Sequence, residues 1–336
     1  MIARLFFALL LSLALPCAEA AELPGIPQFI DEMVVKHQLK RDDLVQAFQR
    51  AQRRQSVIDA MSAPATRKPW PEYRATFINP QRINGGLQFW QQYADTLQRA
   101  ENQYGVPQEI IVALIGVETT YGRNAGKYST LDALTTLAFD YPRRAAFFRS
   151  ELEQYLLLAR EQDFDLLKVQ GSYAGALGIP QFMPSSYRKH AVDFDGDGKI
   201  DLLHDTQDAI GSVANYLRQY GWLSRESIAV PASVGVDYYA GKLAASQRVM
   251  EWAVSGVKPD KPVDPDQSAR LIDFTVADGK EFWLAFGNFD VITRYNNSDF
   301  YAMSVFQLAE ALRDARTAQS QDVRCSIGCD SLTKLR

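Results

Sequence analysis

The run from Ile110 to Val117 constrains the fold of this chain more than any other segment. In "EIIVALIGVETTYGRN" these eight residues carry no charged and no polar side chain, and the run leads directly into Glu118. Its length, and Pro107 just before it, predict a helix that is buried on all sides rather than an amphipathic surface helix. The sequence therefore predicts a core helix with a lone carboxylate in or just after its last turns.

Glu118 is the first candidate for chemistry because burial changes how a carboxyl group titrates. Loss of hydration disfavours the ionised form and raises the pKa, so such a group can hold a proton near neutral pH and donate it to a glycosidic oxygen. The position taken alone also fits a surface carboxylate at a helix end. The next acidic residue along the chain is Asp132, and no matched pair stands out. One carboxylate that acts twice therefore remains open as a mechanism.

The remaining pattern predicts a mainly α protein of the α+β class. Helical spacing of apolar residues covers 27–60, 86–103, 142–160, 183–190, 208–220 and 298–317. Between the first two, the proline-rich "SAPATRKPWPEYR" predicts an ordered loop that carries Trp70 and Tyr73. Alternating apolar residues from Ile272 to Phe286, with a turn at Asp278-Gly279, predict a β-hairpin.

The segment "DFDGDGKID" predicts a calcium loop. Asp193, Asp195 and Asp197 occupy positions 1, 3 and 5 of an EF-hand loop, and Gly198 follows at the sharp turn. Lys199 would offer its backbone carbonyl at position 7. Position 12 holds His204, a poor Ca²⁺ ligand, so the last carboxylate has to come from Asp205 or Asp208. We expect a structural Ca²⁺ site; a solvated acidic turn is the alternative.

The N-terminal sequence predicts an exported protein. "MIARLFFALLLSLALPCAEA" has the charge, apolar run and A-x-A cleavage site of a signal peptide, so the mature chain should begin near Ala21. Cys17 suggests a lipoprotein, but Pro16 before it favours soluble export. Cys325 and Cys329 could form a small-loop disulfide in an oxidising compartment. A net charge of −4, with no basic stripe, excludes non-specific nucleic-acid binding.

Four segments together resemble the lytic murein transglycosylase B family. They are "GVETTYGRNAGKYSTLDALTTLAFDYPRR", "GSYAGALGIPQFMPSSYRKHAVDFDGDGKIDL", "DAIGSVANYLRQYGW" and "ITRYNNSDFYAMSVFQLAEAL". The resemblance extends from about Pro27 to Leu312. It implies a lysozyme-like core with a helical α-domain and a small β-rich insert domain. The division that follows is a signal peptide at 1–20, an α-domain at 21–105, a core at 106–225, a β-domain at 226–287, a C-terminal helix at 288–317 that packs back on the core, and a flexible tail at 318–336.

The resemblance also implies the reaction. It is non-hydrolytic cleavage of the β-1,4 bond between N-acetylmuramic acid and N-acetylglucosamine, which leaves a 1,6-anhydro end. Glu118 matches the single catalytic acid and base of the family. Two alternatives stay open: a hydrolytic muramidase, which needs a second carboxylate to hold water, and a non-catalytic glycan-binding module stabilised by calcium.

The other functional residues of the family are carried over at matching positions. The residues expected to bind the glycan are Tyr73, Ser172, Gln181, Tyr216, Tyr295, Asn296 and Tyr301. Arg143 and Arg144 are expected to meet stem-peptide carboxylates, and Asp208 is expected to complete the calcium site. The implied partners are peptidoglycan strands and stem peptides, with cell-wall synthesis or hydrolase proteins as further candidates. The implied state is a periplasmic monomer.

Overall fold

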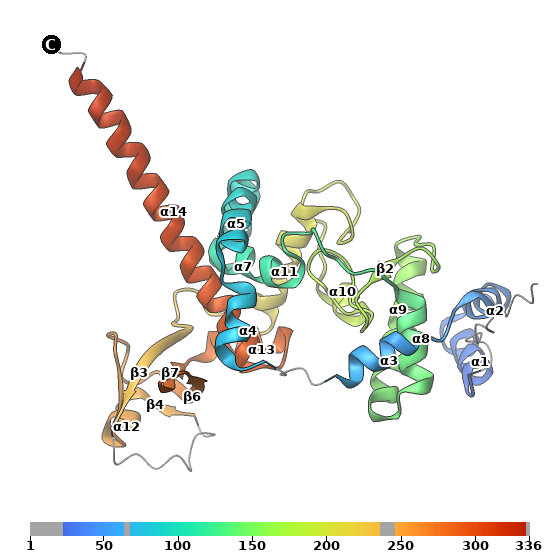
Figure 1. The fold of residues 1–336 in the computed structure, drawn as a ribbon. Helices are drawn as coiled ribbons and strands as arrows, with labels where there is room; N and C mark the ends of the chain where they lie inside the picture. Colours follow the sequence, from blue (N-terminus) through green and yellow to red (C-terminus); the bar gives the residue numbers. More distant parts are fainter. Residues whose placement is uncertain (1–22, 64–67, 236–245, 334–336) are drawn as a thin grey trace, which may run out of the picture.

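The computed structural model describes residues 23–63, 68–235 and 246–333, with side chains described as far as 321. The signal peptide expected at 1–20, Cys17, and the side chains of Cys325 and Cys329 lie outside this part of the chain. The described residues are mainly helical with a small antiparallel sheet, as expected (Figure 1). None of their helices is both long enough and apolar enough to cross a membrane.

The elements follow one another along the chain in a mostly helical order. The helices are α1 (Ile26–His37), α2 (Arg41–Arg50), α3 (Gln55–Ser62), α4 (Trp70–Phe77), α5 (Pro80–Gln92), α6 (Ala94–Tyr104), α7 (Gln108–Thr119), α8 (Thr130–Asp140), the 3-10 helix η2 (Pro142–Arg144), α9 (Ala145–Glu161), α10 (Pro184–His190), α11 (Thr206–Gln219), α12 (Val249–Val254), α13 (Gly287–Tyr295) and α14 (Asp299–Thr333). The strands are β1 (Tyr128–Ser129), β2 (Gln170–Gly171), β3 (Ala229–Val234), β4 (Gln247–Arg248), β5 (Val257–Pro259), β6 (Ser268–Val276) and β7 (Gly279–Ala285).

Helix α7 contains the apolar run and lies at the centre of the core. Every residue from Ile110 to Val117 is buried, which confirms the helix expected there. Helices α5, α6, α11 and α14 pack around it (Figure 1). Ridges on all sides of α7 therefore find apolar partners, which is why the run needs no polar face.

A five-stranded sheet lies wholly within the segment expected to form a β-domain, and it is separate from the two-stranded pair of β1 and β2. The five strands run in the order β4-β6-β7-β3-β5, and β6 and β7 form the expected hairpin. Val276 pairs with Gly279, so the turn residues are Ala277 and Asp278, one position earlier than expected. This sheet has its own buried cluster, which includes Trp252 and Phe286.

Several helices contact elements that the sequence assigned to a different domain. Helix α3 contacts α8, and ion pairs of Lys36 with Glu153 and of Glu32 with Arg149 join α1 to α9; the sequence assigned α8 and α9 to the core. Ion pairs join Arg53 to Asp140 and Arg54 to Asp132 across this contact. Helices α4–α6 instead contact α7, α11 or α14. The division into 21–105, 106–225, 226–287 and 288–317 stays a prediction, because sequence order alone does not tell which helices meet in space.

Three expected elements differ in the structure. The proline-rich segment ends in helix α4, not in a loop, because Pro71 lies in the first turn, where no backbone N–H is needed. The expected helix at 86–103 is two helices that meet at Tyr93. The last helix begins at Asp299 as expected, but it continues to Thr333 instead of ending near Thr317.

Candidate active site and calcium loop

The backbone that follows Glu118 turns sharply at the end of α7. Thr120 and Tyr121 both have positive φ values, 54° and 64°, which are rare for residues with a β-branched or bulky side chain. Thr119 holds this turn because its Oγ1 donates to the carbonyl of Ile179 (2.8 Å) and accepts from the N–H of Gly122 (2.9 Å). The "TTYG" of the sequence therefore ends the helix directly after the carboxylate.

Tyr121 folds back under α7 and needs two glycines to do so. A Cβ on Gly116 would lie 2.7 Å from the Tyr121 ring, and one on Gly86 would lie 2.5 Å from its hydroxyl oxygen. That hydroxyl donates to the carbonyl of Arg82 at 2.8 Å. The ring is thus held between α5 and α7, and it fixes the end of the helix that carries Glu118.

Arg82 on α5 is a residue that the sequence did not single out. Its Nη1 donates to the carbonyl of Gly116 and to Oγ1 of Thr120 (2.9 Å). The Gly116 carbonyl also accepts from the N–H of Thr120, so Arg82 adds a second donor to it and ties α5 to the last turn of α7. A lone arginine in a polar stretch gives no sequence signal for such a contact, so only the fold could reveal it.

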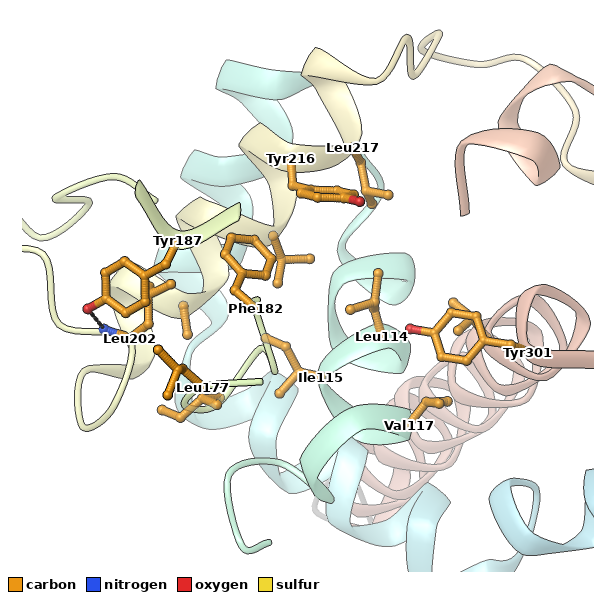
Figure 2. Packing of buried hydrophobic residues seen from close by; sticks show 14 of the residues in the cluster. Leu114, Ile115, Val117, Leu177, Phe182, Tyr187, Leu202, Tyr216, Leu217 and Tyr301 are labelled. Carbon is orange, nitrogen blue, oxygen red and sulfur yellow. Dashed lines mark hydrogen bonds between the residues drawn. The ribbon is translucent and has the colours of Figure 1, made fainter. Parts of the chain in front are cut away.

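Glu118 is partly buried and has a strongly perturbed pKa. Burial raises the pKa of its carboxyl group to about 7, and a hydrogen bond from Tyr301 acts in the opposite direction. The Tyr301 hydroxyl donates to Oε1 of Glu118 at 2.5 Å. Figure 2 shows Tyr301 reaching from α14 towards α7 beside Val117. Glu118 can therefore hold or release a proton near neutral pH.

Expected glycan-binding tyrosines from three other elements lie around this carboxyl group. Burial and the negative charge of Glu118 together raise the pKa values of Tyr73 on α4 and Tyr295 on α13. The Tyr295 hydroxyl donates to the carbonyl of Pro180 at 2.5 Å. Tyr216 on α11 lies one ring further away, with its centroid 4.8 Å from that of Tyr295. The structure therefore brings four of the expected tyrosines together, counting Tyr301.

Ser172 and Gln181 have their polar atoms on the loop that precedes α10. The Ser172 hydroxyl accepts from the N–H groups of Ala174 and Ala176. Gln181 has a φ of 52°, and its amide donates to the carbonyls of Ala125 and Gly178, both at 2.9 Å. Both side chains stabilise the loop conformation in this structure.

The last three expected substrate-binding residues are exposed. Arg143 and Arg144 lie on η2, where the guanidinium of Arg144 covers the Phe147 ring at 4.4 Å. Asn296 lies just after α13. Within the described part of the chain, no hydrogen bond, ion pair or ring contact links these three side chains to Glu118.

The acidic loop has the donor set of a hard-cation site. Ligand oxygens of Asp193, Asp195 and Asp197 all lie within 4.8 Å of one another. Gly196 and Gly198, with φ values of 83° and 88°, allow the tight turns between them. Three carboxylates at this separation fit Ca²⁺, which prefers several oxygen ligands.

Asp208 lies at the base of this loop and is buried. Its Oδ1 accepts from the N–H of Phe194 (2.7 Å), and its Oδ2 accepts from the N–H of Asp201 (2.8 Å). Burial raises the pKa of its carboxyl group. Asp208 thus ties α11 to the loop, and it is not part of the three-carboxylate cluster in this structure.

Comparisons with known proteins agree with this geometry. A family model described as a transglycosylase SLT domain matches residues 22–310. The membrane-bound lytic murein transglycosylase B of Escherichia coli is 46% identical over 306 residues, which cover 88% of this chain and 84% of that protein.

Two solved structures extend the comparison to the fold. The lytic transglycosylase Slt35 of Escherichia coli in complex with calcium has a TM-score of 0.83 at 45% identity, covering 88% of this chain and 95% of that one. SltB3 of Pseudomonas aeruginosa in complex with NAG-NAM-pentapeptide has a TM-score of 0.78 at 29% identity, covering 86% and 80%. The lysozyme-like fold expected from the sequence is confirmed. The chain therefore belongs to the lytic murein transglycosylase B family, lyases that act on peptidoglycan.

Proposed function

We propose that Glu118 carries out both proton transfers in the non-hydrolytic cleavage of the β-1,4 bond between N-acetylmuramic acid and N-acetylglucosamine. The observation that carries the proposal is its pKa of about 7, which burial at the end of α7 produces. A group with this pKa is protonated in a large fraction of molecules at neutral pH, yet it is basic enough to take a proton back.

Glu118 gives one proton in the first step and takes one proton in the second, so it returns to its starting state. Protonated Glu118 gives its proton to the glycosidic oxygen as the C1–O bond of the muramoyl sugar breaks. The resulting carboxylate then takes the proton of the muramoyl 6-hydroxyl as that oxygen bonds to C1, which closes the 1,6-anhydro ring. The Tyr301 hydroxyl, which donates to Oε1, stabilises the carboxylate between the steps.

A hydrolytic muramidase is the nearest alternative, and it makes a different demand on the site. It would need a second carboxylate to hold water on the opposite face of the sugar. Within the described residues, the groups whose pKa values the charge of Glu118 raises are Tyr73, Tyr295 and Tyr301, and none of them is a carboxylate. This surrounding favours the intramolecular 6-hydroxyl over an activated water.

The surrounding residues have supporting roles in the proposal. The tyrosines at the site, with Ser172, Gln181 and Asn296, would bind the glycan. Arg143 and Arg144 would meet stem-peptide carboxylates through their exposed guanidinium groups. Asp193, Asp195 and Asp197, with the Lys199 carbonyl, would hold a structural Ca²⁺, and Asp208 would support the loop. A peptidoglycan substrate also agrees with the signal peptide expected at 1–20 and with export to the periplasm.

Mass spectrometry of muropeptides released from purified peptidoglycan tests this function. The mature chain should release products one water lighter than those of a muramidase, and Glu118→Gln should release none. A Gln variant that folds and still cuts would remove Glu118 from the mechanism. Full-mass reducing ends from the wild type would identify a muramidase instead, and glycan binding without cleavage by either would leave a binding module.

A further inference from the structure

The side chain of Arg82 contacts α7 on both sides of Glu118. Its Nη1 donates to the carbonyl of Gly116 and, at 2.9 Å, to Oγ1 of Thr120. These two acceptors lie two residues before and two residues after Glu118 in the sequence. Helices α5 and α7 lie side by side (Figure 1). A single guanidinium group from α5 therefore holds the stretch of backbone that carries the carboxyl group.

The backbone of Arg82 is fixed as well. Its N–H donates to the side chain of Asn79 at 2.9 Å, which caps the start of α5, and its carbonyl accepts from the Tyr121 hydroxyl at 2.8 Å. Thr120 and Tyr121 both have positive φ values, a conformation that persists at functional sites only where the surrounding contacts determine it. Arg82 supplies such a contact to each of these two residues.

The guanidinium group of Arg82 is half-buried without a carboxylate partner. Burial lowers its pKa, and among the described residues it forms no ion pair. Burying a charge is costly unless a partner offsets the loss of hydration. The acceptors of Arg82 are neutral oxygens at the C-terminal end of α7, where the helix dipole favours a cation. The group is therefore explained by the helix end that it holds and not by charge pairing.

The carboxyl group of Glu118 is sensitive to how this helix end is placed. The Tyr301 hydroxyl donates to its Oε1 at 2.5 Å, and a hydrogen bond weakens steeply as its geometry departs from the optimum. Burial and this hydrogen bond are the influences on the Glu118 pKa, so Arg82 acts on the carboxyl group through its position and not through charge. The other titratable groups in the charge field of Glu118 are Tyr73 on α4 and Tyr295 on α13.

We propose that Arg82 is a positioning residue of the cleavage reaction: it holds the backbone on both sides of Glu118 and so keeps the carboxyl group aligned with the Tyr301 hydroxyl and with the glycosidic oxygen. This role rests on the proposed function, because it acts through the proton transfers of Glu118. Arg82 itself transfers no proton and does not touch the reacting atoms. A catalytic group that is misplaced by about 1 Å can lose about 100-fold in rate, so the effect belongs to the chemical step.

The rate of release of anhydro products by Arg82 variants of the mature chain tests this role. Arg82→Met removes every donor from a long side chain, and its kcat should fall about 10- to 100-fold. Arg82→Lys keeps the charge on a shorter side chain and should lose about three- to tenfold, a partial rescue. Arg160→Met is the matched control, because Arg160 also donates through Nη1 to a backbone carbonyl, that of His37 at 2.8 Å, but joins α9 to α1. It should cleave as the wild type does.

A double-mutant cycle with Tyr301→Phe separates positioning from a purely structural role. If Arg82 aligns the two groups, Tyr301→Phe should lower kcat by less than about threefold in the Arg82→Met background, because the hydrogen bond is already misaligned there. The alkaline limb of the pH–rate profile should also move to higher pH in Arg82→Met, since the carboxylate loses the Tyr301 donor. A residue that only stabilised the fold would lower the Tm and leave this limb in place. Either additive losses in kcat or an unmoved alkaline limb would overturn the proposal; if Arg82→Met does not fold, Arg82→Lys decides in the same cycle.

Glu118→Gln, assayed beside these variants, keeps the result apart from the proposed function. If the wild type releases 1,6-anhydro products, Glu118→Gln releases none, and the Arg82 variants match the wild type, the role of Arg82 fails alone. If Glu118→Gln cleaves at the wild-type rate, the proposed function fails, and the role of Arg82 fails with it.

Discussion

At the scale of the residue, the structure gives Glu118 two opposing influences. Burial raises its pKa, and the hydrogen bond from Tyr301 lowers it; burial is the larger effect. The same carboxyl group can therefore act as an acid first and as a base afterwards. The sequence identified Glu118 from the apolar run before it. It placed Tyr301 only through the family resemblance, because nothing in residues 299–312 alone marks a hydroxyl that reaches α7.

Tyr301→Phe should separate these influences. Without the hydroxyl, the pKa of Glu118 should rise further above its usual range, and the alkaline limb of the pH–rate profile should move to higher pH. kcat should fall roughly 10- to 100-fold, since a charged hydrogen bond contributes about 1.5–3 kcal/mol. Tyr295→Phe is the control for the pH limb alone, because its hydroxyl donates to the carbonyl of Pro180 and not to Glu118. An alkaline limb that stays in place in Tyr301→Phe would contradict the assignment.

The same pKa predicts how stability depends on pH. Between pH 4.5 and about 7 the folded chain keeps a proton on Glu118 that the unfolded chain has lost. The contribution of this group to the free energy of unfolding therefore falls as the pH rises through that window. The side chain in Glu118→Gln does not titrate. The Tm of the variant minus that of the wild type should therefore increase from pH 4.5 to pH 8. A constant Tm difference across this range would mean that the pKa is not raised.

At the scale of the element, the end of α7 is held by its neighbours more than by its own sequence. Arg82 caps carbonyl and hydroxyl acceptors there, and Tyr121 packs against Gly116. Periodicity predicted α11 and the β6–β7 hairpin, and the length of the unbroken apolar run predicted α7. It missed α4 and the break at Tyr93, since Pro71 was taken as a loop signal and helix α6 follows α5 almost directly.

Gly116→Ala tests this packing. A methyl group would lie 2.7 Å from the Tyr121 ring, so the ring or the helix has to move. We expect a loss of about 1–3 kcal/mol in the free energy of unfolding, as in other overpacked sites, together with reduced activity. Gly287→Ala in α13 is the matched control, because no atom lies within 4 Å of its added carbon. Equal free energies of unfolding for the two variants in urea would show that the Tyr121 contact does not stabilise the fold.

At the scale of the whole molecule, residues from distant segments build one site. Helices α4, α7, α13 and α14 supply Tyr73, Glu118, Tyr295 and Tyr301. Sequence motifs named these residues, but the grouping of α1–α3 with α8 and α9 and the length of α14 could not be predicted. The grouping depends on which helix faces meet after folding. The length of α14 was missed because the apolar pattern of residues 318–333 is too weak to predict a helix.

The acidic loop gives a prediction at this scale, because Asp208 ties it to α11 in the core. Removal of Ca²⁺ with a chelator should lower the Tm, and added Ca²⁺ should raise it with concentration; at 1,000 times Kd the gain is about 4 kcal/mol. Mg²⁺ should be a poor substitute, because it binds few all-protein oxygen cages. Asp195→Asn should weaken the response. A Tm that is indifferent to Ca²⁺ would leave the loop as a solvated acidic turn.

The most direct test of the central claim follows the oxygen that bonds to C1. Purified glycan strands are digested in H₂¹⁸O by the mature chain, and the new ends are weighed by mass spectrometry. If Glu118 directs the muramoyl 6-hydroxyl to C1, the products end in 1,6-anhydro sugars and carry no ¹⁸O. Reducing ends that contain one ¹⁸O would show that water attacks C1, and the account of a single carboxylate acting as acid and then base would be wrong.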